Sequence, residues 1–195
     1  RITHGCTGLY SEENEVAMRR VINFCREVGH SRIAIQLNHA GRKASSNLPW
    51  KGGKSLAVGE GAWQAFAPSA VPISDGWHMP QALDEAGLAR IREAFIDSTH
   101  RAARLGLDAV ELHAAHGYLL HTFLSPVSNQ REDQYGGSFD NRVRFPLEIL
   151  SAVRKAWPAK KPLIVRLSAT DWMEGGWSLQ QSIALAPLLE EAGCN

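Results

Sequence analysis

The sequence predicts an α/β protein whose strands form a parallel sheet. Three short apolar segments of average strand length carry this prediction, at residues 33–37, 109–113 and 163–167. Stretches with helical spacing of apolar side chains flank and separate these segments. Strands that are separated by helices cannot pair as hairpins, so the predicted sheet is parallel.

Four helices are predicted, at residues 11–28, 84–105, 141–156 and 178–192. Asp84, Asn141 and Ser178 are the expected N-caps of the last three, because their side-chain oxygens accept hydrogen bonds from backbone amides of the first turn. Gly106 and Gly193 are expected to end the second and fourth helices. The predicted order therefore alternates helix and strand along most of the chain.

Residues 40–83 interrupt this alternation with several prolines and no clear helix. A loop of this length inside a compact domain is usually functional. Trp50, Trp63 and Trp77 lie within it, so we expect it to be ordered and packed.

The composition is that of a soluble globular protein, with 44% hydrophobic and 21% charged residues among 195. A net charge of +1 argues against a basic surface that binds nucleic acid or a membrane. No apolar run approaches the ~20 residues that a membrane span needs. Cys6, Cys25 and Cys194 form an odd, widely spaced set, which indicates a reducing compartment and a cytoplasmic protein. Because the chain begins at Arg1, we expect a fragment of a longer protein.

Polar side chains occur at the C-terminal ends of all three predicted strands, where parallel α/β proteins place their chemistry. Gln36 and Arg166 stand within apolar segments and are expected to be buried. A carboxamide offers donors and an acceptor, which suits a flat heterocycle. A buried arginine needs an anionic or strongly polar partner. Either a ligand or an internal salt bridge with Glu111 satisfies Arg166, and the sequence leaves both alternatives open.

His113, His116 and Tyr118 follow the second predicted strand and form the candidate catalytic and substrate-binding group. Two imidazoles can donate hydrogen bonds to one carbonyl oxygen, and a phenol can deliver a proton as a general acid. Two alternatives remain open: structural histidines, or a zinc site. A zinc site needs a third ligand, for which the sequence offers His39, Glu111 or Asp171.

Four segments together resemble the Old Yellow Enzyme family, most closely its bacterial xenobiotic-reductase and NADPH-dehydrogenase branch. They are QLNHAGR at 36–42, ELHAAHGYL at 111–119, RxDxYGGSxxNR at 131–142 and VRLS at 165–168. The resemblance runs from Arg1 to Asn195, in order and with similar spacing.

The resemblance implies a partial (β/α)8 TIM barrel. The three strands become the third to fifth of eight, with a long excursion after the first of them. Residues 1–195 then form the central part of a single FMN-binding barrel domain that lacks its N-terminal and C-terminal strands. The implied activity is a flavin-dependent oxidoreductase. It takes hydride from NADPH or NADH onto FMN and reduces the activated C=C bond of α,β-unsaturated carbonyl compounds.

The resemblance also assigns roles to single residues. Gln36 and Arg166 contact the flavin, His113 and His116 bind the substrate carbonyl, Tyr118 donates the proton, and no metal takes part. The implied partners are a small enone-type substrate and, as often in this family, further copies of the chain, with no nucleic acid or membrane. Two other functions remain open: a metal-dependent TIM-barrel hydrolase that uses the histidine cluster, and an inactive barrel fragment.

Overall fold

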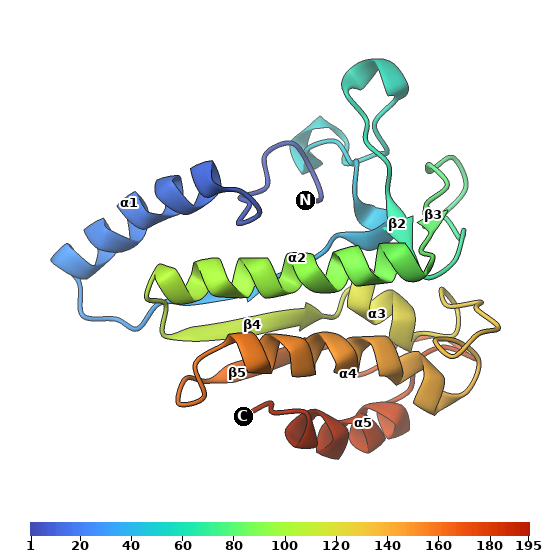
Figure 1. The fold of residues 1–195 in the computed structure, drawn as a ribbon. Helices are drawn as coiled ribbons and strands as arrows, with labels where there is room; N and C mark the ends of the chain where they lie inside the picture. Colours follow the sequence, from blue (N-terminus) through green and yellow to red (C-terminus); the bar gives the residue numbers. More distant parts are fainter.

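A computed structural model describes residues 1–195, except for the side chain of Val58. Its centre is a three-stranded parallel sheet in the order β1–β4–β5 (Figure 1). These strands are β1 (Ala34–Leu37), β4 (Ala109–Ala114) and β5 (Leu163–Leu167). The three predicted strands and their parallel pairing are therefore confirmed.

Five α-helices accompany the sheet: α1 (Glu12–Val28), α2 (Glu85–Arg104), α3 (Leu119–Leu124), α4 (Phe139–Ala156) and α5 (Leu179–Glu191). Asp84 and Ser178 cap α2 and α5 as predicted. The prediction of Asn141 as an N-cap is wrong, because the Ser138 hydroxyl accepts the Asn141 amide hydrogen and starts α4 two residues earlier. The short helix α3 was not predicted. All six of its residues are buried, so it lacks the exposed polar face that identifies a surface helix.

The excursion between β1 and α2 is ordered, as predicted. It holds three one-turn 3-10 helices and a parallel pair of two-residue strands, β2 (Phe66–Ala67) and β3 (Gln81–Ala82). Arg131 joins the two strands where both end, since its guanidinium donates to the carbonyl oxygens of Pro68 at 2.9 Å and Leu83 at 2.6 Å. Trp63 and Trp77 are half-buried, but Trp50 is exposed and does not pack as expected.

Helices cover only one face of the sheet. Val110, Leu112 and Leu163 project from this face and are fully buried in a core that they share with α2, α4 and α5. Figure 1 shows α2 and α4 lying across β4 and β5 on this side. Because side chains alternate along a strand, the intervening residues point to the opposite, open face. A doubly wound sheet has helices on both faces, whereas one-sided cover is the arrangement of a barrel wall.

We expect Phe145→Ala to lower the free energy of unfolding by about 3–5 kcal/mol, the usual cost of a large cavity in a core. Phe145 is fully buried on α4, with its ring centroid 4.6 Å from that of Phe123. The matched control is Phe24→Ala on α1, where the side chain is 63% exposed and the change should stay within about 0.5 kcal/mol. Denaturant titration of both variants checks the prediction, and equal losses would contradict the packing described above.

Candidate functional site

Strand register places four predicted polar residues on the open face of the sheet. Gln36 of β1 lies opposite Glu111 of β4, and His113 of β4 lies opposite Arg166 of β5. Register partners on parallel strands project from the same face, and Glu111 and His113 are two residues apart on one strand. All four side chains therefore share the face that no helix covers.

The expectation that Gln36 and Arg166 are buried is wrong, because no helix covers this face and both residues are exposed, whereas His113 on the same face is buried. The internal salt bridge is also wrong as an explanation of Arg166. The Glu111 carboxylate instead accepts a hydrogen bond from the Gln36 side-chain amide. Arg166 makes no hydrogen bond or ion pair with any residue that the structure describes, so its charge is available to a ligand.

The structure brings His113, His116 and Tyr118 together, as predicted. His113 is near the end of β4, and the other two belong to residues 115–118, here called the β4 turn. The His113 ring centroid lies 5.0 Å from that of His116 and 4.9 Å from that of Tyr118. His116 and Gly117 both have left-handed backbone, with φ of 58° and 70°. Glycine adopts this conformation freely, but for a histidine it is strained.

Backbone amides decide which histidine nitrogen carries the proton. The Ala115 amide donates to His113 Nδ1 at 3.2 Å, so that nitrogen is unprotonated and Nε2 carries the hydrogen. His113 Nε2 lies 3.3 Å from His116 Nδ1 and donates to it. The remaining hydrogen of the neutral pair is therefore on Nε2 of His116, a residue that is exposed to solvent.

The surroundings keep both imidazoles neutral. Burial lowers the pKa of His113 to about 4, and the charges of His116 and Arg166 add to this effect. The pKa of His116 is also lowered, by desolvation first and then by the cations of Arg166 and Lys43. Burial raises the pKa of the Tyr118 phenol, which therefore keeps its proton at neutral pH. The group thus offers neutral N–H and O–H donors.

Two further residues hold the β4 turn and were not found from the sequence. The Lys43 ammonium donates to the His116 carbonyl oxygen at 2.7 Å, and the His116 amide donates to the Ser168 hydroxyl at 2.9 Å. Ser168 directly follows β5 and Lys43 directly follows the QLNHAGR segment. The position of Ser168 at the end of β5, and that of Lys43 in the loop that follows β1, were the signals that could have identified them.

The proposed third zinc ligands do not join the histidine pair. His39 Nδ1 accepts the Gly41 amide hydrogen at 3.1 Å, Glu111 binds Gln36, and Asp171 binds His121 at 2.7 Å. Among the described residues, no group of three His, Cys, Asp or Glu side chains has the geometry to hold a metal ion. The geometry therefore gives no support to the metal-dependent hydrolase.

The donor set on the open face fits a flavin ring. A primary amide at Gln36 and an unpaired guanidinium at Arg166 border the histidine group on strands to either side of β4. The pyrimidine end of a flavin carries alternating donors and acceptors, and its reduced form carries negative charge that a cation stabilises. Gln36 and Arg166 are thus the residues that could hold FMN.

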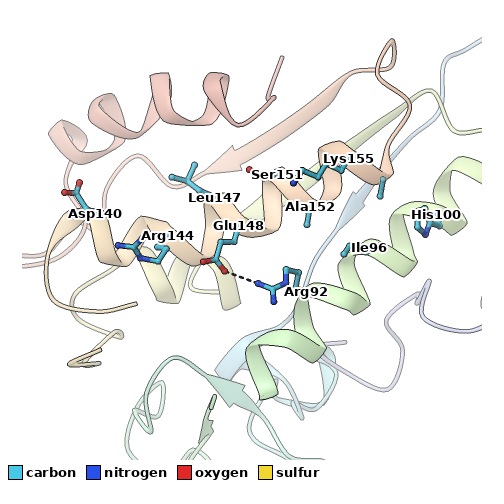
Figure 2. Close-up of a pocket in the computed structure, with 11 residues that line it drawn as sticks. Arg92, Ile96, His100, Asp140, Arg144, Leu147, Glu148, Ser151, Ala152 and Lys155 are labelled. Carbon is cyan, nitrogen blue, oxygen red and sulfur yellow. Dashed lines mark hydrogen bonds and ion pairs between the residues drawn. The ribbon is translucent and has the colours of Figure 1, made fainter. Parts of the chain in front are cut away.

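The outer helical layer contains a separate groove of about 740 Å³ between α2 and α4 (Figure 2). Arg92 and Glu148 form an ion pair of 3.2 Å across it. None of the predicted site residues lines this groove. The candidate site therefore remains at the carboxyl ends of the strands.

One-sided helix cover and chemistry at the strand carboxyl ends define a segment of a (β/α)8 barrel. Residues 1–194 match the model of the NADH:flavin oxidoreductase / NADH oxidase family, and the chain belongs to this family. The resemblance to the Old Yellow Enzyme family and the prediction of a partial barrel are confirmed, and FMN with a nicotinamide reductant is the cofactor set of this family.

Individual relatives agree with the family assignment. The chain is 41% identical to an NADH:flavin oxidoreductase of Gibberella zeae and 38% identical to an NADPH dehydrogenase of Bacillus subtilis, with 99% of the chain aligned in both comparisons. Morphinone reductase in complex with tetrahydroNAD superposes with a TM-score of 0.77 at 29% identity over 96% of the chain. The chain spans 50%, 52% and 53% of these three proteins. In the part of the chain that the structure describes, no helix is long and apolar enough to cross a membrane.

The low pKa of His113 predicts a pH dependence of stability. In the unfolded chain this imidazole titrates near 6.5, whereas in the folded protein it stays neutral down to about pH 4. The unfolded state therefore binds the proton first, so the contribution of His113 to the free energy of unfolding is fully present above pH 6.5 and is lost as the pH falls to about 4. Denaturant titrations across this window check this, with His113→Gln as the control that should show a shallower slope. Equal slopes would contradict the assignment.

Proposed function

We propose that the whole protein reduces the C=C bond of α,β-unsaturated carbonyl compounds. The observation that carries this proposal is the packing of a protonated phenol against two neutral imidazoles at one strand end, at Tyr118, His113 and His116. These groups provide hydrogen-bond donors for a carbonyl oxygen and a proton for the neighbouring carbon. A solved structure to which the chain is similar is a morphinone reductase in complex with tetrahydroNAD, and its name supports a reductase function.

The histidine pair binds and polarises the substrate carbonyl in this proposal. As the C=C bond accepts hydride at its β carbon, negative charge develops on the carbonyl oxygen. The N–H groups at Nε2 of His113 and His116 stabilise this charge by hydrogen bonding. The substrate oxygen takes the place of His116 Nδ1 as the acceptor of the His113 hydrogen. Because both rings are neutral, they donate hydrogen bonds without giving up a proton.

Tyr118 supplies the proton in this proposal. A general acid must keep its proton until the reaction takes it, and the raised pKa of the phenol ensures this at neutral pH. The Lys43 ammonium lies 5.5 Å from the centre of the Tyr118 ring. Its positive charge favours the phenolate that remains after the α carbon has been protonated.

Bound FMN would supply the hydride-transfer chemistry between NADH or NADPH and the substrate. Gln36 would orient its ring system through the carboxamide, and the unpaired Arg166 would stabilise negative charge on it. In this proposal residues 1–195 are the central part of a single FMN-binding barrel domain. The free thiols of Cys6, Cys25 and Cys194 support a cytoplasmic location, and a homo-oligomer without nucleic acid or membrane is the proposed state.

Tyr118→Phe should slow enone reduction by roughly 10²–10⁴-fold, the usual effect of losing a general acid. The ring and its packing against His113 are kept, so substrate binding and flavin reduction by the nicotinamide should change little. Rapid-mixing measurements of the two half-reactions separate these effects. Tyr135→Phe is the matched control, because that phenol contacts Glu148 and not the β4 turn. Wild-type alkene turnover in Tyr118→Phe would assign the proton to another donor.

Arg166→Met should weaken FMN binding roughly tenfold to a hundredfold, because a charge-assisted hydrogen bond contributes about 1.5–3 kcal/mol. The matched control is Arg32→Met. Arg32 is an exposed arginine that lies just before β1 and pairs with Asp108. Fluorescence titration of the apoprotein with FMN measures both variants. Equal FMN affinity in Arg166→Met and the unmodified protein would refute the proposed role of Arg166.

A further inference from the structure

A buried histidine–aspartate pair lies beneath the β4 turn and takes no part in the function proposed above. His121 is on α3, and Asp171 follows β5 in the loop that leads to α5. His121 Nε2 lies 2.7 Å from Asp171 Oδ1, and the two side chains are only 8% and 11% exposed. The pair therefore joins α3 to the loop after β5, between residues fifty positions apart in the sequence.

The hydrogen bonds around this pair define the state of both partners. The Gly117 amide donates to His121 Nδ1 at 2.9 Å, so His121 carries its proton on Nε2 and donates it to Asp171. Asp171 also accepts from the Ser125 hydroxyl at 2.6 Å and from the Trp177 amide at 2.7 Å. Burial raises the pKa of Asp171, but these three hydrogen bonds outweigh burial and lower it to about 2. Asp171 is thus a fixed anion that orients the His121 ring.

The Gly117 amide, which donates to His121, lies in a strained part of the backbone. His116 and Gly117 are consecutive left-handed residues, and a non-glycine residue keeps this conformation only when its surroundings hold it there. Lys43 binds the His116 carbonyl oxygen and Ser168 binds the His116 amide, which leaves the Gly117 amide to His121. These three backbone groups are therefore each held by a side chain from a different part of the chain.

We propose that His121, oriented by Asp171, is a positioning residue for the β4 turn. It fixes the Gly117 peptide so that His116 on one side and Tyr118 on the other present their donors to the same substrate. Neither member of the pair touches the substrate. The proposal rests on the proposed function of His116 and Tyr118, but the hydrogen-bond arrangement that it requires can be measured without any substrate.

Two substitutions of His121 separate its two hydrogen bonds. Asparagine places an oxygen at the position of Nδ1, so His121→Asn keeps the acceptor for the Gly117 amide and loses the contact with Asp171. Glutamine places an amide nitrogen at the position of Nε2, so His121→Gln keeps the donor to Asp171 and loses the acceptor for Gly117. Thr122→Val is the matched control on α3, since it removes a buried bond to the Leu119 carbonyl that does not involve the turn.

The test measures amide hydrogen exchange at Gly117 together with enone turnover in the FMN-loaded whole protein. In His121→Gln we expect faster exchange at Gly117. We also expect a fall of about 10–100-fold in kcat for a cyclic enone, the usual effect of losing a group that orients a site. Flavin content and the rate of flavin reduction by NADPH should stay unchanged. Thr122→Val should resemble the unmodified protein in Gly117 exchange and in enone turnover. His121→Asn keeps the acceptor for Gly117 but loses the orienting contact with Asp171, so it should change both quantities less than His121→Gln does.

Three results would overturn the proposal: a His121→Gln variant with normal exchange and turnover, equal losses in the Asn and Gln variants, or equal losses in Thr122→Val. If the variants do not fold, ¹⁵N NMR of the unmodified protein decides, because the proposal requires an unprotonated Nδ1 at His121 and a protonated Nδ1 would refute it. A protein with this tautomer and a protected Gly117 amide but no enone turnover would refute the proposed function alone.

Discussion

The site depends on the alternation of side chains along β4, the central strand of the sheet. Val110 and Leu112 point into the helical layer and are fully buried, which fixes the strand. Glu111 and His113 must then point to the opposite face, beside Gln36 and Arg166 of the neighbouring strands. The same apolar contacts that stabilise the fold therefore place the polar groups, and a shift of one residue in register would exchange the two sets.

Backbone amides also determine which ring nitrogen of each histidine near the site carries the hydrogen. Amides of Gly41, Ala115 and Gly117 each donate to Nδ1 of a histidine, at His39, His113 and His121 respectively. A main-chain amide only donates, so each ring keeps its hydrogen on Nε2. For His113 this hydrogen faces His116, and for His121 it faces Asp171. The path of the chain thus determines which atoms can act as donors.

The sequence predicted the strands and most helix caps, because apolar periodicity and capping side chains act locally. It failed where tertiary contacts decide. Helix α3 is short and has no exposed face, so apolar periodicity does not reveal it. Ser138 and not Asn141 is the N-cap of α4. Similarly, the apolar neighbours of Arg166 suggested burial, although they lie on the covered face while Arg166 lies on the open one. The histidine and tyrosine group was recognisable because its members are close in sequence, whereas Lys43, Ser168 and Asp171 reach it only through folding.

In the proposed function, the β4 turn and the open face form one site that couples a flavin to a conjugated carbonyl compound. The most direct measurement follows the absorbance of the flavin in the whole protein without oxygen, first with NADPH and then with 2-cyclohexenone. We expect the flavin band to disappear with NADPH and to return with the enone, while cyclohexanone forms in equal amount. A flavin band that NADPH bleaches but the enone does not restore, or a purified protein without flavin, would refute the coupling of flavin and enone at this site.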